Sequence, residues 1–328
     1  MKPHGSARAL VIGSEGNIGA PLVAYLRTLG YEVLECDIKP ALRPNYLVAD
    51  INQALDLLPA FDWSPNVVFL LAAVVGRTTA EQASGLAIAT NLAGVNNVLQ
   101  LCKREKSTCV YISTSEIYGP TSPSMEETAT PHPGNRYGLS KWLAEQLVEY
   151  EARACGLRAV TLRPCMVYDE MEEVGEHRSA MIRFASRLAR GLPIEVHRGT
   201  ARSWLHISDA VRAIEAAAHL ESHTIINIGH PEVVRMIDLA EMIRHELRAD
   251  PGLIRTVPLP PQITAVKHPS LERQRLLLQF EPRIDLLEGV QRVCAEQRRL
   301  VASATRGEKA EVKPVPGPHP ELLRANAS

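Results

Sequence analysis

The stretch Ala7–Gly19, ARALVIGSEGNIG, decides the fold of this 328-residue chain. Its first half is a short apolar run, which is typical of a buried parallel β-strand. Its second half carries Gly13, Gly16 and Gly19, which permit a tight turn and let a phosphate approach the backbone closely. A helical pattern then continues to Leu29. The stretch therefore predicts a strand, a glycine-rich turn and a helix whose N-terminus can bind a dinucleotide.

Acidic residues after the next apolar runs support this interpretation. The strand predicted over 31–37 ends in Asp37, about 20 residues beyond the turn, as the dinucleotide fingerprint requires. Asp37 would accept hydrogen bonds from both hydroxyls of the adenosine ribose and would repel a 2′-phosphate, so we predict NAD rather than NADP. The alternatives are a solvated aspartate and a glycine triplet that serves packing alone. Asp50 and Ile51 follow another apolar segment and are predicted to flank the adenine.

Composition and charge argue against several classes of function. With 36 Lys and Arg against 37 Asp and Glu, the net charge of −1 gives no electrostatic footprint for nucleic acid or an anionic membrane. No apolar run approaches transmembrane length, and the N-terminus lacks the apolar segment of a signal peptide. The six cysteines are scattered without a C-x-x-C pair, which is typical of free thiols in a reducing compartment. We expect a cytoplasmic protein without a metal site.

Strands and helices alternate along the first half of the chain. Further strands are predicted over 67–71, 108–113 and 158–163, with helices over 82–104 and 137–154. Such alternation implies parallel βαβ units with right-handed crossovers. The predicted fold is therefore an α/β Rossmann-type doubly wound parallel sheet with a smaller C-terminal substrate-binding lobe.

The alternation breaks after Pro164 and later resumes. Residues 169–203 are charged and irregular around one helical stretch at 180–190. Later helices are predicted over 207–219, 236–247 and 285–299, and strands over 224–228 and 254–257. The predicted domains are an NAD-binding domain over 1–168 whose sheet is completed by 204–228, a substrate-binding lobe over 169–203 and 229–301, and a disordered tail over 302–328.

Tyr137 and Lys141 stand one turn apart on the helix predicted over 137–154. An ammonium beside a phenol favours the phenolate, because an opposite charge stabilises the ionised form. A phenolate near neutral pH is a general base that can take a proton from a sugar hydroxyl. The pair alone proves little, since tyrosine and lysine often share an exposed helix face.

Several ordered motifs together carry a resemblance to a known family. Besides the glycine turn and Asp37, they are Ala72-Ala73, NLAGVNNVL at 91–99, STSEIYG at 113–119, YGLSK at 137–141, RSWLHISD at 202–209 and NIG at 227–229. With them the chain resembles the extended short-chain dehydrogenase/reductase family, and within it the nucleotide-sugar epimerases, dehydratases and decarboxylases. The resemblance runs from about residue 7 to about residue 299.

The resemblance implies specific catalytic roles. Tyr137 would be the general base, Lys141 would bind the nicotinamide ribose, and Thr114 would hydrogen-bond the substrate oxygen. A sugar hydroxyl would be oxidised transiently by NAD, and the ketone would make epimerisation, elimination or decarboxylation feasible. Glu116 would assist that second stage by transferring a proton. A net oxidoreductase that releases NAD(P)H and a non-catalytic NAD-binding sensor are the alternatives.

The motifs and the resemblance also imply a set of binding residues. The predicted cofactor contacts are Gly13, Gly16, Asn17, Ile18, Gly19, Asp37, Asp50, Ile51, Leu71, Ala72, Ala73, Asn91, Lys141 and Pro164. The predicted substrate contacts are Arg77, Ser115, Met166, Arg202 and His206. Met166 replaces an asparagine common in the family, so we expect a sugar or nucleotide sugar other than an ordinary UDP-hexose. Family members commonly dimerise through the helices at 82–104 and 137–154, so we also expect a homodimer.

Overall fold

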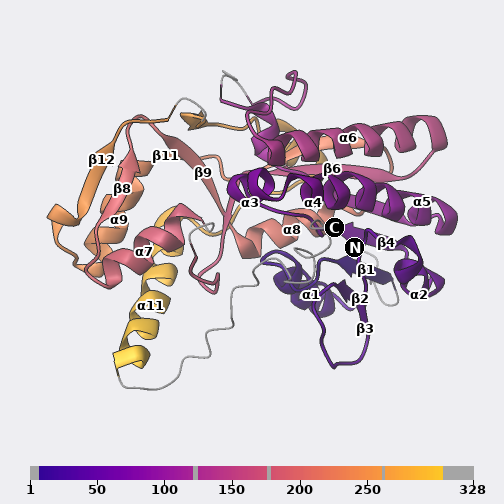
Figure 1. The fold of residues 1–328 in the computed structure, drawn as a ribbon, viewed down its shortest axis with the longest axis horizontal. Coiled ribbons are helices and arrows are strands. Elements are labelled where there is room, and N and C mark those ends of the chain that lie inside the picture. Colours follow the sequence, from indigo (N-terminus) through magenta and orange to yellow (C-terminus); the bar gives the residue numbers. More distant parts are fainter. Residues whose placement is uncertain (1–6, 121–124, 176–178, 261–262, 306–328) are drawn as a thin grey trace, which may run out of the picture.

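A seven-stranded parallel sheet forms the centre of the larger region of the protein (Figure 1). The computed structural model describes residues 7–120, 125–175, 179–260 and 263–305. The sheet order is β10-β6-β5-β4-β1-β2-β3. The strands are β1 (Arg8–Ile12), β2 (Glu32–Asp37), β3 (Tyr46–Val48), β4 (Val67–Leu70), β5 (Thr108–Ile112), β6 (Ala159–Pro164) and β10 (Thr224–Ile228). The Rossmann-type fold predicted from the sequence is confirmed.

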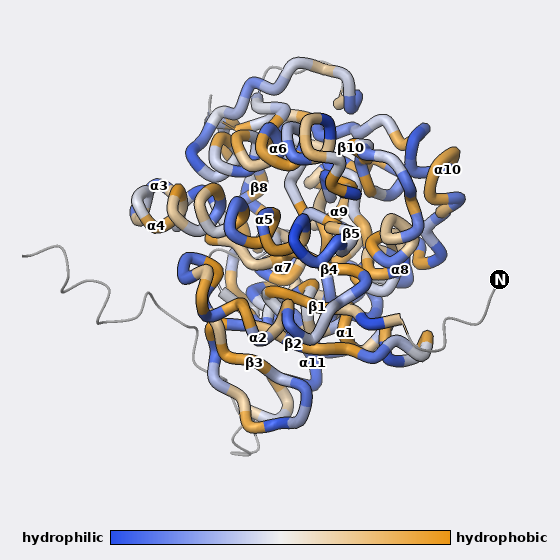
Figure 2. Tube along the Cα trace, turned by 90° about the vertical axis from the view of Figure 1, so that its right-hand side faces the viewer, coloured by the Kyte–Doolittle hydropathy of each residue, from blue (hydrophilic) through white to orange (hydrophobic). Residues whose placement is uncertain are grey.

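Helices cover both faces of this sheet, because successive side chains of each strand point to opposite faces. On β1, Ala9 and Val11 belong to one apolar cluster, whereas Leu10 and Ile12 belong to the other. The first cluster includes α1 (Gly19–Thr28) and α8 (Ile207–Ala217), and the second includes α2 (Leu58–Asp62), α5 (Val95–Glu105) and α6 (Arg136–Cys155). In Figure 2 the central strands are largely hydrophobic, and hydrophobic and hydrophilic residues alternate along the helices around them.

The strand order reverses between β1 and β4, which places a crevice at their carboxyl ends. The glycine turn follows β1, and Leu71 and Ala72 follow β4. The backbone N–H of Ala72 donates to Ile12 O at 2.9 Å, so these two connections lie against each other. In an open α/β sheet this switch point is where a dinucleotide binds.

The helix predicted over 82–104 is confirmed as a continuous helical stretch that begins two residues later. It consists of α4 (Ser84–Ile88), the π-helical turn η2 (Ala89–Gly94) and α5, and a separate short helix, α3 (Arg77–Gln82), precedes it. Ala83 leaves the helical conformation with φ −121° and ψ 56°, which separates α3 from α4. A Cβ on Gly94 would lie 2.6 Å from Ile51 Cγ1, so close contact with a distant segment determines the path of this helix.

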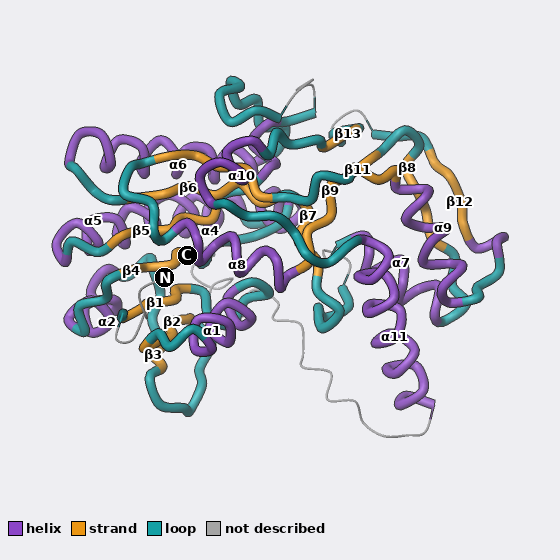
Figure 3. The backbone as a smooth tube through the Cα atoms, turned by 180° about the vertical axis from the view of Figure 1, so that it is seen from behind, coloured by secondary structure: helices purple, strands orange, loops and turns teal. Residues whose placement is uncertain are grey.

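A second region with its own apolar core extends to the left of the sheet in Figure 1. Its strands are β7 (Met166–Tyr168), β8 (Ile194–His197), β9 (Ala201–His206), β11 (Val233–Arg235), β12 (Ile254–Val257) and β13 (Val266–Lys267). Strand β9 pairs with β7, β11 and β13, and β8 pairs with β12. The helices are α7 (Ala180–Ala189), α9 (Met236–Leu247) and α11 (Leu286–Thr305), and a short helix α10 (Glu272–Leu278) contacts β10 and α8. Figure 3 shows β7 and β9 between the two regions.

The second region differs from the sequence prediction in its regularity and in where its last helix ends. Residues 169–203 are less irregular than predicted, because β8 and part of β9 lie in this segment. Helix α11 continues to Thr305, past the predicted start of the tail, and residues 306–328 lie outside the described residues.

No helix in the described part of the chain is long and apolar enough to cross a bilayer. The domain boundaries, the homodimer and the cytoplasmic location stay predictions.

Candidate active site

The glycine turn after β1 leaves space that side chains at the glycine positions would fill. Gly13 has φ +91°, and a Cβ there would lie 2.6 Å from Ala72 N. A Cβ on Gly19 would lie 2.0 Å from Gly13 O. Helix α1 has no side-chain hydrogen bond at its N-cap, Ile18, so no side chain competes there for its first N–H groups. The exposed Gly16 and the positive end of α1 therefore fit a dinucleotide pyrophosphate.

The predicted adenosine contacts lie at the same edge of the sheet. Asp37 is 9% exposed at the end of β2, and its Oδ2 and Oδ1 accept the backbone N–H groups of Glu15 (2.8 Å) and Lys39 (3.1 Å). Asp50 and Ile51 follow the neighbouring β3. Ile51 is buried beneath Gly94, whereas Asp50 Oδ1 accepts the backbone N–H of Asn52 at 2.9 Å. Their position agrees with the sequence analysis, and their contact with the cofactor stays a prediction.

Asn91, predicted as a cofactor contact, uses its side chain within the protein. Its Oδ1 accepts Val74 N at 2.7 Å, and its Nδ2 donates to Val74 O at 3.0 Å and to Ser140 Oγ at 2.9 Å. Leu71, Ala72 and Val74 belong to one connection after β4, so Asn91 fixes that connection against α6. The structure therefore gives the fully buried Asn91 a positioning role beside the cofactor crevice.

Local hydrogen bonds hold Tyr137 beside the end of β5. Thr114 Oγ1 accepts Glu116 N at 3.2 Å and also hydrogen-bonds with the Tyr137 side chain. Asn135 Oδ1 accepts Gly138 N at 2.8 Å and thereby caps the N-terminus of α6. A Cβ on Gly138 would lie 2.8 Å from Glu116 O, so the glycine lets the first turn of α6 rest on the segment that carries Thr114. The structure thus brings together three predicted catalytic residues.

Burial dominates the protonation of Tyr137 and Lys141. It raises the pKa of Tyr137 to about 12, although the hydrogen bond from Thr114 lowers it. It lowers the pKa of Lys141 to about 7, against the opposing attraction of Glu145. The Lys141 ammonium lies 4.3 Å from the centre of the Tyr111 ring. The expectation that Lys141 lowers the pKa of Tyr137 is therefore not met in the protein alone, and a phenolate needs further positive charge at this site.

Glu116 forms a partly buried ion pair with Lys267, which the sequence analysis missed. Lys267 Nζ donates to Glu116 Oε1, and Asn135 Nδ2 donates to Oε2 at 3.0 Å. Burial alone would raise the pKa of Glu116, but Lys267 and the charge of Arg77 lower it to about 2. Lys267 is 4% exposed and lies on the two-residue strand β13. The sequence offered no signal for it, because a lone lysine in a proline-rich segment has no recognisable pattern.

Arg202 holds β13, and thus Lys267, in place. Its guanidinium donates to Ala265 O and Thr264 O, each at 2.7 Å, and β13 pairs with β9 so that Lys267 lies opposite Arg202. Burial lowers the pKa of Arg202 to about 10, while the charge of Glu116 raises it. Arg77 begins α3 and its charge acts on both Glu116 and Arg202. Lys267, Arg77 and Arg202 thus give the surroundings of Glu116 an excess of positive charge.

The remaining predicted substrate residues have structural partners. The His206 ring lies between Ser208 Oγ and Glu170 Oε2, each at 2.8 Å, and it caps the N-terminus of α8. Met166 lies on β7 opposite Trp204 and packs against the core of the second region. The Ser115 hydroxyl hydrogen-bonds with the Cys165 thiol. Pro164 ends β6 beside Ile228. These contacts leave their roles in binding as predictions.

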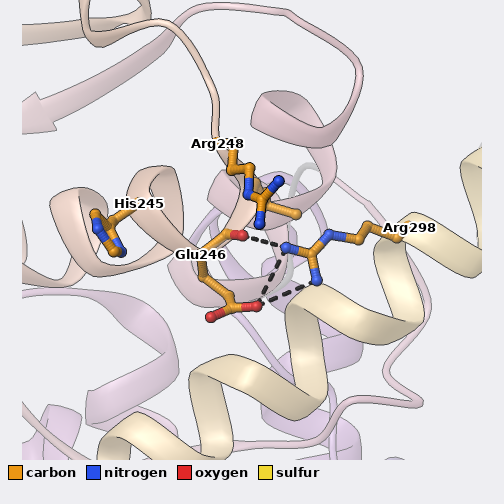
Figure 4. Close-up of a pocket in the computed structure, with 5 residues that line it drawn as sticks. His245, Glu246, Arg248 and Arg298 are labelled. Atoms are coloured by element: carbon orange, nitrogen blue, oxygen red, sulfur yellow. Dashed lines mark hydrogen bonds and ion pairs between the residues drawn. The ribbon is translucent and has the colours of Figure 1, made fainter.

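A surface hollow of about 430 Å³ lies elsewhere, at the C-terminal ends of α9 and α11 (Figure 4). Its lining residues are His245, Glu246, Leu247, Arg248 and Arg298. Arg298 donates to the carboxylate of Glu246 at 3.1 Å, which satisfies both charges. None of the residues predicted from the sequence lines this hollow, so it is separate from the group around Tyr137 and Glu116.

Comparison with known proteins identifies similar enzymes over most of the chain. A UDP-N-acetyl-alpha-D-glucosaminuronate decarboxylase from Bacillus cytotoxicus is 27% identical over 311 residues, which cover 86% of this chain and 95% of the relative. UDP-glucuronic acid decarboxylase 1 from Arabidopsis thaliana is 26% identical, over 92% of this chain and 72% of the relative. The fold matches a UDP-glucose 4-epimerase from Thermotoga maritima, solved with UDP-glucose, at a TM-score of 0.84 and 23% identity, over 90% of this chain and 99% of that one.

The sequence also matches the model of a protein family. The match covers residues 9–229, which include the glycine turn, Asp37, Thr114, Tyr137 and Lys141. The resemblance and the NAD cofactor inferred from the sequence are thereby confirmed. This chain belongs to the NAD dependent epimerase/dehydratase family of enzymes.

Proposed function

We propose that the protein is an NAD-dependent decarboxylase of a sugar acid carried by a nucleotide. The observation that carries this proposal is the ionised Glu116, held at a pKa of about 2 beside Lys267 and Arg77. The two relatives named above are decarboxylases of such sugar acids, at 27% and 26% identity. The excess positive charge around Glu116 would suit a substrate that brings a carboxylate of its own.

The protonation of Glu116 separates decarboxylation from two other reactions of the family. Epimerisation at a carbon next to the ketone requires a base that removes a proton from carbon, and elimination of water also requires an acid for the leaving hydroxyl. Inversion at the oxidised carbon itself requires neither, because the hydride returns to the other face of the ketone, so product analysis must separate it from decarboxylation. A carboxyl group with a pKa of about 2 is a poor base and a poor acid near neutral pH. Decarboxylation needs no base, because the electron pair of the breaking C–C bond passes into the adjacent ketone as carbon dioxide leaves.

The residues around the cofactor crevice divide the reaction between them. Tyr137 would take the proton of the sugar hydroxyl as a phenolate, which the positive charge of bound NAD would favour, and the Thr114 hydroxyl would hydrogen-bond the same oxygen. When bound in the crevice, NAD would supply the acceptor for the hydride of the carbinol carbon and the source from which that hydride is returned. As carbon dioxide leaves, Tyr137 and Thr114 donate hydrogen bonds to the oxygen on which negative charge develops. The cationic side chains Lys267 and Arg77 bind the carboxylate before it is lost.

Product analysis in D₂O tests this proposal. The purified protein is incubated with UDP-glucuronate, UDP-N-acetylglucosaminuronate or UDP-glucose, and the products are analysed by mass spectrometry. We expect loss of carbon dioxide and uptake of one deuteron on carbon from at least one of the two acids, and no reaction of UDP-glucose. An isomer formed without loss of carbon dioxide or water would identify an epimerase, whether it takes up a deuteron next to the ketone or none at the oxidised carbon, and loss of water would identify a dehydratase. Either result would overturn the proposal.

A further inference from the structure

Six charged side chains form a cluster around Asp37, at the end of the glycine turn where the adenosine ribose is expected. We call them the ribose-end cluster; its members are Glu15, Arg27, Glu35, Asp37, Lys39 and Arg43. Three are acidic and three are basic, so the cluster is neutral as a whole. Its basic residues matter for the choice between NAD and NADP, because a cation near Asp37 could bind the 2′-phosphate of NADP.

Both cations next to Asp37 are already engaged. Lys39 Nζ donates to the backbone carbonyl of Glu15 at 3.3 Å. Arg43 donates from Nη2 to carboxylate oxygens of both Glu15 and Glu35, and its Nε donates to Glu35 Oε1 at 3.2 Å. The Arg43 guanidinium also lies 4.5 Å from the centre of the Tyr46 ring. Arg43 is thus held in a bridge between two acids.

Glu15 has a special position in this bridge. Its backbone N–H donates to Asp37 Oδ2 at 2.8 Å, so the Glu15 side chain begins next to the acid that is expected to bind the ribose. Glu35 is different, because it is 2% exposed and also binds Arg27 at 2.6 Å. Without Glu15, Glu35 would still hold Arg43 in place, and the guanidinium would gain free N–H donors.

We propose that Glu15 is a second specificity-determining residue, which makes the protein prefer NAD to NADP together with Asp37. It acts in two ways: its carboxylate adds negative charge beside Asp37, and it engages the Arg43 donors that a 2′-phosphate would otherwise receive. The inference concerns the cofactor alone and holds whichever sugar the enzyme modifies.

Competition between the two dinucleotides tests the proposal. Full-length wild type, Glu15→Gln, Asp37→Ser and the double variant are equilibrated with equimolar NAD and NADP. Free dinucleotide is removed, and the bound dinucleotides are quantified by liquid chromatography. In the Asp37→Ser background, Glu15→Gln should raise the bound NADP:NAD ratio by about tenfold, the effect of one charge-assisted hydrogen bond. In the otherwise unchanged chain it should raise the ratio in the same direction.

Two further variants separate this effect from a general change of charge. Glu32→Gln alters an exposed residue at the opposite end of the same strand, β2, and should leave the ratio unchanged. Arg43→Leu added to the double variant should abolish the gain in NADP. An unchanged ratio in Glu15→Gln would overturn the proposal, as would a gain that survives Arg43→Leu. If Asp37→Ser binds neither dinucleotide, the Glu15→Gln variant alone decides the outcome.

Discussion

The parallel-sheet region and the second region contribute to the site in different ways. In the sheet region, Thr114 and Tyr137 are placed by local features: the end of β5, the Asn135 cap and the first turn of α6. In the second region, Lys267 reaches Glu116 only because β13 pairs with the distant strand β9. In the proposed reaction, oxidation would therefore depend on local structure in the sheet region, and the choice of substrate would depend on long-range pairing in the second region.

Measuring hydride transfer and product formation separately tests whether the two regions have these different roles. We predict that Tyr137→Phe slows reduction of bound NAD by about a thousandfold, because the hydroxyl proton loses its acceptor. Lys267→Met should instead leave NAD reduction within about tenfold of wild type and slow release of carbon dioxide about a hundredfold. Rapid-mixing absorbance of the reduced cofactor and mass spectrometry of the product measure the two steps.

The conservative variant provides the control for this pair. Lys267→Arg keeps the positive charge beside Glu116 and should retain most of the product formation. Lys267→Met removes that charge, so product formation should fall, and the pKa of the partly buried Glu116 carboxylate should rise from its value of about 2. Equal losses of both steps in Lys267→Met would contradict the division of roles between the two regions.

The same contrast explains what the sequence could predict. Strand β10 and helix α9 were predicted with the observed bounds, because apolar runs and helical periodicity are properties of short segments. The glycine turn and Asp37 were placed at the correct edge of the sheet because a parallel strand fixes where its carboxyl end lies. Local patterns therefore predicted the fold and the cofactor side of the site.

Predictions failed where distant contacts decide the structure. The helix predicted over 82–104 contains an unpredicted π-helical turn at Ala89–Gly94, where Gly94 lies close to the distant Ile51. The sequence analysis also missed the contacts that the His206 ring makes with Glu170 and Ser208, whereas its role in substrate binding stays a prediction. Lys267 had no sequence signal at all, since its importance comes from the pairing of β13 with β9. Such side chains become visible only when the tertiary structure is known.

A pair of glycines extends the comparison to stability. Gly13 of the sheet region meets backbone, since a Cβ would lie 2.6 Å from Ala72 N at φ +91°. Gly289 of the second region meets a side chain, with a Cβ 1.7 Å from Tyr168 Oη. We expect Gly13→Ala to lower the free energy of unfolding by about 3 kcal/mol and Gly289→Ala by about 1–2 kcal/mol, measured by urea unfolding.

Two further variants check the cause of these losses. Adding Tyr168→Phe to Gly289→Ala removes the nearest clashing atom and should recover part of the lost stability, whereas backbone cannot be removed at Gly13. Gly85→Ala is the control, because nothing lies within 4 Å of its Cβ position in helix α4. It should be neutral or stabilising by up to about 1 kcal/mol. Equal losses at Gly13 and Gly289 would show that both contacts are equally rigid.

The last expected effect concerns the pH dependence of stability that the buried Lys141 causes. Its pKa in the folded protein is about 7, below the ordinary value of 10.5, because burial disfavours the ammonium. Between these values the unfolded chain binds more protons than the folded one, so stability rises with pH over this window. In NAD-free protein, the stability of wild type relative to Lys141→Met should therefore increase by about 2 kcal/mol between pH 7 and pH 9.

The control for this prediction is Lys106→Met, which replaces an exposed lysine and should show no such change. Parallel pH profiles for wild type and Lys141→Met would mean that Lys141 keeps its proton in the folded protein, so that the sheet region already supplies a cation near Tyr137 before NAD binds.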